Sequence, residues 1–161
     1  MKVFNIGKVK NISILIIASV LLVTVVCVCP FPIRVDTTME GFYVDAQGQI
    51  TENVSVEVTG WYLRYLLLED DLRVEFDLND PAKHSLKMQG ATQLGDSEYF
   101  YASGWYYIPD ENSVDGATML FDKPFKRCAL RFMDEGCYVL SSDPSVDLNA
   151  FWQAAKVRLS L

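Results

Sequence analysis

Four side chains have the chemistry for nucleophilic or acid–base catalysis: the single histidine His84, the cysteines Cys128 and Cys137, and Arg131. A thiolate can attack a carbonyl, a histidine can move its proton, and an arginine can stabilise the oxyanion that forms. However, His84 alternates with apolar residues on the expected inner face of a strand, which favours a structural histidine. The sequence contains no H-E-x-x-H, C-x-x-C or phosphate-binding loop. We therefore predict no catalytic residue, no cofactor and no bound metal.

This set of side chains resembles the catalytic set of the sortase transpeptidases in the role that each residue could play. That resemblance implies a Cys137 or Cys128 nucleophile, His84 as acid and base, and Arg131 at the oxyanion. Neither cysteine lies in the Thr-Leu-x-Thr-Cys strand of that family. A tethered cysteine transpeptidase is therefore the alternative function, and the leading prediction is non-enzymatic.

Cys128 and Cys137 are predicted to be free thiols. Residues 125–133 and 137–142 flank a turn and predict a hairpin, in which Cys137 would lie opposite Met133. At that register Cys128 is roughly 16 Å further along the strand. A disulfide needs α-carbons within about 7 Å of each other, so the hairpin keeps the two sulfurs apart.

A strand over residues 98–108 is unusually rich in aromatic residues. Alternation places four of them on one face, which predicts an exposed platform for a protein or glycan partner at the cell surface. The alternative is a strand that is buried on both faces. The predicted binding residues are Tyr99, Tyr101, Trp105 and Tyr107.

An uncharged apolar run from Ile12 to Cys29 predicts a transmembrane helix. It has 18 residues, which span roughly 27 Å as a helix, close to the thickness of a bilayer core. Three lysines precede the run and every acidic residue follows it. The lysine and arginine bias therefore predicts a cytoplasmic N-terminus and a C-terminal domain outside the membrane.

Whether this segment is cleaved decides between two locations. A signal peptide ends in a small-x-small cleavage site, and here the run ends in cysteines and valines followed by Pro30. We predict an uncleaved, single-pass signal-anchor in the cell membrane. A secreted soluble module, released by cleavage, is the alternative.

The expected organisation is a cytoplasmic tail over residues 1–11, the helix over 12–29, a linker over 30–40 and an exported domain over 41–161. Short segments with period-two alternation and frequent turns predict an antiparallel β-sandwich or open barrel. Asp143 and Pro144 are expected to start a C-terminal helix. Its alternative is a final strand over residues 156–161.

Charge limits the partners of the exported part. All 21 acidic residues and eleven of the 14 basic residues lie after residue 29, which gives this part a net charge of −10. Nucleic acid is an improbable partner because phosphate binding needs a basic surface. The sequence therefore favours a membrane-anchored, extracytoplasmic binding or assembly module.

Overall fold

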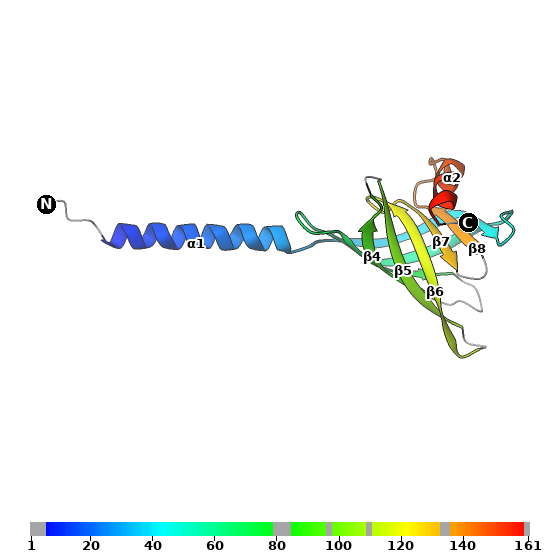
Figure 1. The fold of residues 1–161 in the computed structure, drawn as a ribbon, viewed down its shortest axis with the longest axis horizontal. Coiled ribbons are helices and arrows are strands. Elements are labelled where there is room, and N and C mark those ends of the chain that lie inside the picture. Colours follow the sequence, from blue (N-terminus) through cyan, green and yellow to red (C-terminus); the bar gives the residue numbers. More distant parts are fainter. Residues whose placement is uncertain (1–5, 79–84, 96–97, 109–110, 133–135, 160–161) are drawn as a thin grey trace.

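The protein is an eight-stranded antiparallel barrel with a helix at each end of the chain (Figure 1). The computed structural model describes residues 6–78, 85–95, 98–108, 111–132 and 136–159, and the side chains of the first helix from residue 14 onward. The elements are α1 (Ile6–Val28), β1 (Phe31–Asp45), β2 (Ile50–Arg64), β3 (Asp71–Asp77), β4 (Leu86–Gln93), β5 (Tyr99–Ile108), β6 (Ser113–Asp122), β7 (Arg127–Phe132), β8 (Gly136–Ser141) and α2 (Leu148–Arg158).

Each strand pairs with the next along the chain, and β1 closes the barrel against β8. β1 can do this because it is long: residues 31–44 pair with β2, and residues 40–45 also pair with β8. The predicted antiparallel, mainly β fold with a C-terminal helix is confirmed. The sandwich alternative is wrong, and the barrel is closed rather than open.

Apolar side chains fill the interior of the barrel. Alternation along each strand turns one set of residues inward, and the largest fully buried ones include Tyr62, Phe76 and Tyr106. The Phe132 ring packs edge-on against Tyr106, with 5.1 Å between the ring centres. A barrel of eight strands has an interior just wide enough for such side chains to fill. The inner space is therefore a packed core.

A second apolar layer lies outside the barrel wall, where α2 covers β7 and β8. Phe151, Trp152 and Ala155 of α2 are buried against outward-facing residues such as Val139. Asp147 caps the helix, because its carboxylate accepts hydrogen bonds from the first-turn amides. The predicted helix is confirmed and the final-strand alternative is wrong. The expected start at Asp143 and Pro144 is also wrong, since these residues lie before the cap.

The linker expected over residues 30–40 is the first part of β1, apart from Pro30. Pro32 suggested a chain outside the sheet because proline cannot donate a ladder hydrogen bond. At this point, however, β1 has β2 as a neighbour on one side and does not yet pair with β8. Proline is compatible with such an edge position. The barrel therefore begins almost directly after α1.

α1 begins at Ile6, earlier than the predicted start at Ile12, and ends at Val28. It extends away from the barrel, and its described side chains are almost all exposed (Figure 1). Within the part of the chain that the structure describes, no helix combines the length and the apolar character of a membrane span.

Candidate functional site

The predicted aromatic platform lies on the outer face of β5. Phe100, Ala102 and Tyr106 point into the barrel and are buried, whereas Trp105 and Tyr107 are 44% and 49% exposed. The alternative of a strand buried on both faces is therefore wrong for this half of β5. The alternation of residues along β5 predicted these two faces, because one side of each strand must fill the core.

The other half of the predicted platform is covered by α2. The Tyr99 ring packs against Phe151, with 5.8 Å between ring centres, and the Arg158 guanidinium lies 4.9 Å from the Tyr99 ring centre. Tyr101 is half-buried in the same apolar layer. The four predicted binding residues therefore do not form one surface: Tyr99 and Tyr101 support α2, and Trp105 and Tyr107 remain open.

Trp105 borders a shallow pocket of about 350 Å³ on the outer wall. Lys87 on β4 is the cross-strand neighbour of Trp105, and Glu75 on β3 is the cross-strand neighbour of Lys87. Trp61 is 48% exposed on β2 and is paired with Arg73 of β3, which also lines the pocket. We call these outward-facing side chains the outer aromatic face: Trp61, Arg73, Glu75, Lys87, Trp105 and Tyr107.

Trp61 was not among the predicted site residues, although the sequence carried the signal for it. It precedes Tyr62, which is fully buried, so alternation places Trp61 outside. No family model, curated protein or solved structure matches this chain. The role of the outer aromatic face therefore follows from its own geometry and charge.

The residues of the alternative transpeptidase site are placed unfavourably for catalysis. Cys128 lies in the barrel core, and Cys137 is buried under α2. Burial raises the pKa of both thiols, that of Cys137 to about 12 even though the Arg131 charge opposes this shift. A reactive cysteine needs the opposite shift. His84 lies outside the described residues.

Arg131 is the cross-strand partner of Cys137, and its guanidinium donates a hydrogen bond of 2.5 Å to the Leu159 carbonyl. This contact ties the end of α2 to the barrel wall. Cys137 was expected opposite Met133, so the predicted hairpin register is wrong by two residues. The faces were predicted correctly, because a shift of two residues preserves which side chains point inward.

We expect Cys128 and Cys137 to resist a maleimide reagent in the folded full-length protein. Cys27 and Cys29 are replaced by serine, so that only the buried pair remains. Labelling requires local opening, so it should be about a thousand-fold slower than in the unfolded chain. Both thiols should then react in denaturant without a reductant, because neither is in a disulfide. Rapid labelling of the folded protein, or labelling only after reduction, would contradict this.

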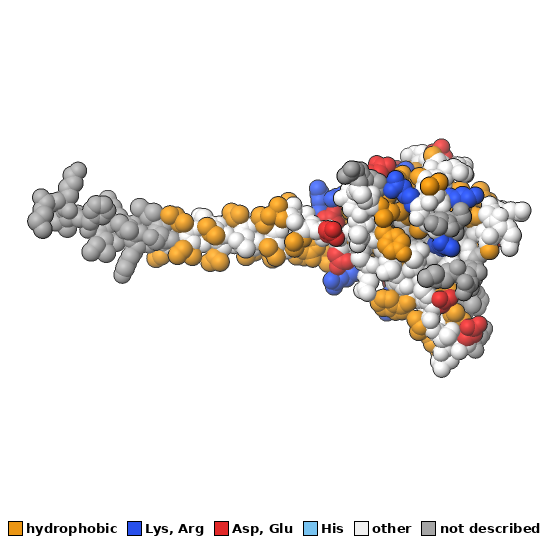
Figure 2. All heavy atoms as spheres, in the orientation of Figure 1, with side chains coloured by type: hydrophobic (Ala, Val, Ile, Leu, Met, Phe, Trp, Pro, Cys, Tyr) orange, Lys and Arg blue, Asp and Glu red, His pale blue; other side chains and the backbone are white. Residues whose placement is uncertain are grey.

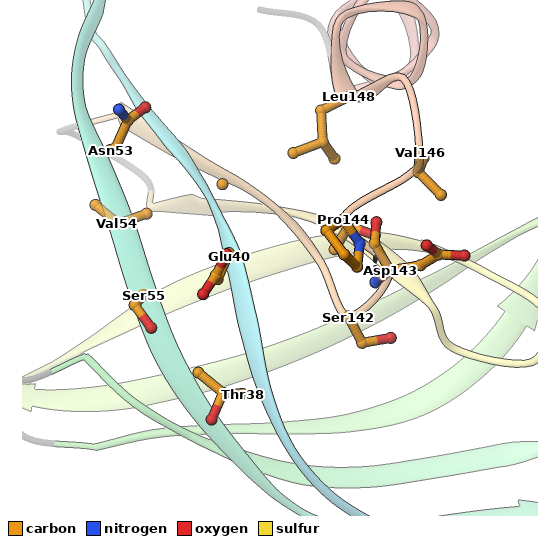
Figure 3. Close-up of a pocket in the computed structure, with 12 residues that line it drawn as sticks. Thr38, Glu40, Asn53, Val54, Ser55, Ser142, Asp143, Pro144, Val146 and Leu148 are labelled. Carbon is orange, nitrogen blue, oxygen red and sulfur yellow. Dashed lines mark hydrogen bonds between the residues drawn. The ribbon is translucent and has the colours of Figure 1, made fainter.

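A second, more polar pocket of about 640 Å³ lies between the outer sides of β1 and β2 and the segment that leads to α2 (Figure 3). Glu40, Asn53 and Ser55 line one side of it, and Asp143 lies on the other. Asp143 is already engaged, since its Oδ1 accepts hydrogen bonds from the Ser145 amide and hydroxyl. These bonds lower the pKa of Asp143.

No cluster of three or more histidine, cysteine or acidic side chains with metal-binding geometry occurs among the described residues. The polar pocket therefore offers single hydrogen-bonding groups rather than a coordination sphere. Its chemistry is less distinctive than that of the outer aromatic face, where large aromatic surfaces meet charges of both signs.

A buried carboxylate organises the end of the barrel nearest α1. Asp70 accepts hydrogen bonds from the Tyr62 hydroxyl at 2.6 Å and the Tyr65 amide at 3.0 Å, and it pairs with the Lys123 ammonium at 2.8 Å. Burial raises the pKa of Asp70, but the bonds from Lys123, Tyr62 and Tyr65 lower it by more, so the net shift is downward. Burial, helped by the Asp70 charge, also raises the pKa of Tyr62. The network closes the loop between β2 and β3.

Proposed function

We propose that this protein is a membrane-anchored, non-enzymatic binding or assembly module that engages a protein partner outside the membrane. The observation that carries the proposal is the exposure of Trp105 and Tyr107 on β5, beside a pocket that Trp105 lines, with Trp61 also exposed on β2 across β3 and β4. Leaving such large side chains in water forgoes the free energy of burying them. Tryptophan and tyrosine are also the residues that most often dominate binding energy at protein interfaces.

The packed interior supports an external binding surface. Lipocalin-sized barrels can hold one small ligand inside, but here inward-facing aromatic rings occupy the space. Binding through the outer wall leaves this core intact. The wall strands also fix the backbone that carries these side chains, which reduces the entropy lost on binding.

The charges around Trp105 favour a protein partner over a glycan. Arg73, Glu75 and Lys87 place both signs of charge between the two exposed tryptophans, on strands β3 and β4. Alternating charges around aromatic anchors are suited to complementary charges on a protein surface, where they fix register and exclude wrong partners.

The proposed anchor is the apolar segment from Ile12 to Cys29, inserted as a single-pass helix with the N-terminus in the cytoplasm. Large apolar side chains of α1, from Ile14 to Val28, are 42–66% exposed. Figure 2 shows hydrophobic side chains along this helix and charged ones where it meets the barrel. A helix without a polar face is stable in lipid, where the hydrocarbon surrounds every side.

We expect Trp105→Ala to weaken partner binding strongly without unfolding the barrel. Full-length tagged protein is used to capture its partner from the native envelope. Truncating a central tryptophan costs about 2 kcal/mol of binding, so recovery at limiting concentration should fall roughly 30-fold. The thermal midpoint should change little, because Trp105 faces outward.

Val157→Ala is the matched control, because Val157 is 81% exposed on α2, outside the outer aromatic face. If wild type, Trp105→Ala and Val157→Ala capture equal amounts of the partner, the proposed surface is wrong. Capture that survives proteolysis of the envelope but not removal of its glycans would overturn the choice of a protein partner. N-terminal sequencing of the mature protein separates an anchored module from a secreted one.

A further inference from the structure

The loop between β2 and β3 exposes three consecutive leucines. Leu66, Leu67 and Leu68 are 57%, 74% and 55% exposed. Turns normally contain polar residues, and a contiguous apolar group on a surface marks a contact with a partner or a membrane. These three side chains belong neither to the barrel core nor to the layer under α2.

The loop lies beside the point where α1 enters the barrel. Arg64, the last residue of β2, is paired with Phe31, the first residue of β1, and α1 ends at Val28. Figure 1 shows the tip of this loop projecting past the barrel alongside the end of α1. Phe31 and Ile33, next to the helix, are 48% and 44% exposed. Exposed apolar side chains therefore occur at the end of α1, at the start of β1 and on the loop, with charged side chains among them (Figure 2).

The base of the loop is polar and held in place. The Asp70 carboxylate bonds the Tyr65 amide across the loop and pairs with Lys123. Arg64 is exposed beside Tyr65. The tip of the loop is therefore apolar, and its base carries a tyrosine and charges of both signs, with Glu69 exposed next to Leu68. Tyrosine and basic residues are typical of the headgroup level of a membrane interface.

We propose that Leu66–Leu68 inserts into the interfacial layer of the bilayer that holds α1, as a second contact between the barrel and the lipid. This inference rests on the membrane anchor of the proposed function. Two contacts fix the orientation of the barrel, whereas a single chain connection would leave it free to turn. β5 runs from Tyr99, paired with Asp122, to Tyr107 near the opposite end, so this orientation leaves Tyr107 and Trp105 accessible from outside the membrane.

The test uses the full-length chain with Cys27→Ser and Cys29→Ser, labelled at Leu67→Cys with an environment-sensitive fluorophore. Vesicles of phosphatidylcholine, with or without spin-labelled phosphatidylcholine as a quencher, provide the membrane. Zwitterionic lipid avoids repulsion by the acidic domain. The control is Val114→Cys, because Val114 is 64% exposed on β6, paired with Tyr107 at the far end of the barrel.

The Leu67 label should shift to shorter wavelength and lose about half of its emission to the quencher, because interfacial side chains lie roughly 5–10 Å into the headgroup and acyl boundary. The Val114 label should show neither change. A blue shift without quenching would indicate contact with a second copy of the chain and would overturn the inference. An unquenched, unshifted label on protein that floats with the vesicles would also overturn it and leave the anchor standing. Failure to float would instead contradict the anchor itself.

Discussion

Replacing Gly41 with alanine is expected to destabilise the barrel by about 3 kcal/mol or more, because the new methyl group has no space. Gly41 is paired with Leu140 where β1 closes the barrel against β8. A β-carbon there would lie 1.8 Å from the Val139 carbonyl oxygen. That oxygen belongs to the backbone of β8, so the clash can be relieved only by moving a strand away from the closing pair.

Gly48→Ala is the matched control for this substitution. Gly48 lies in the exposed turn between β1 and β2 with φ of +80°, and a β-carbon there meets nothing within 4 Å. The cost is then only that of a left-handed backbone, about 1–2 kcal/mol. Urea unfolding of the full-length chain in mild detergent measures both variants. If Gly41→Ala falls within about 1 kcal/mol of wild type, β1 and β8 do not approach as closely as described.

Hydrophobic alternation predicted most strands and their inward faces. Val56 and Val58 of β2, and Leu72, Val74 and Phe76 of β3, are buried as expected. This works because the side-chain period of a strand is two and one face must fill the core. The same rule kept the faces of β7 and β8 correct although the hairpin register was wrong by two residues.

Closure of the barrel could not be predicted in the same way. It depends on β1 being long enough to pair with both β2 and β8, and its first part resembled a proline-containing linker. Nothing local in Pro32 or its neighbours shows which strand will lie on the far side. Closure is a property of non-local pairing, whereas alternation reports only a strand's own two faces.

The candidate site was predicted only in part, and the reason is related. Trp105 and Tyr107 follow from alternation alone. Tyr99 and Tyr101 lie on the same face of the same strand, yet α2 covers them. Strand alternation cannot show which outward residues a later helix will bury. Trp61 was missed because its neighbours through space come from β1 and β3, and it stands in a less aromatic stretch than β5.

The second large effect is expected for Asp70→Asn, which should lower the free energy of unfolding by about 2 kcal/mol at neutral pH. The Asp70 side chain is 3% exposed and that of Lys123 is 43% exposed. Removing one partner of a buried pair typically costs about 3–5 kcal/mol. The half-exposed Lys123 can turn its ammonium into water, and solvent screening already weakens the pair, so the loss lies below that range.

The pH dependence separates this charge effect from a simple packing defect. The folded pKa of Asp70 lies below its unfolded value, which is about 3.9. Its stabilisation is therefore complete above about pH 4 and disappears as the pH falls through the folded pKa. The free energies of unfolding of wild type and Asp70→Asn should differ most at neutral pH and become equal in acid.

Asp71→Asn provides the comparison, because the Asp71 carboxylate pairs with Arg73 at a solvent-exposed position, with side chains 27% and 66% exposed. That variant should lose less than about 1 kcal/mol. If the free energies of unfolding of wild type and Asp70→Asn still differ by the same amount in acid, the shape of the Asp70 side chain, rather than its charge, accounts for its role. Convergence would show that an ionised carboxylate holds together the base of the Leu66–Leu68 loop.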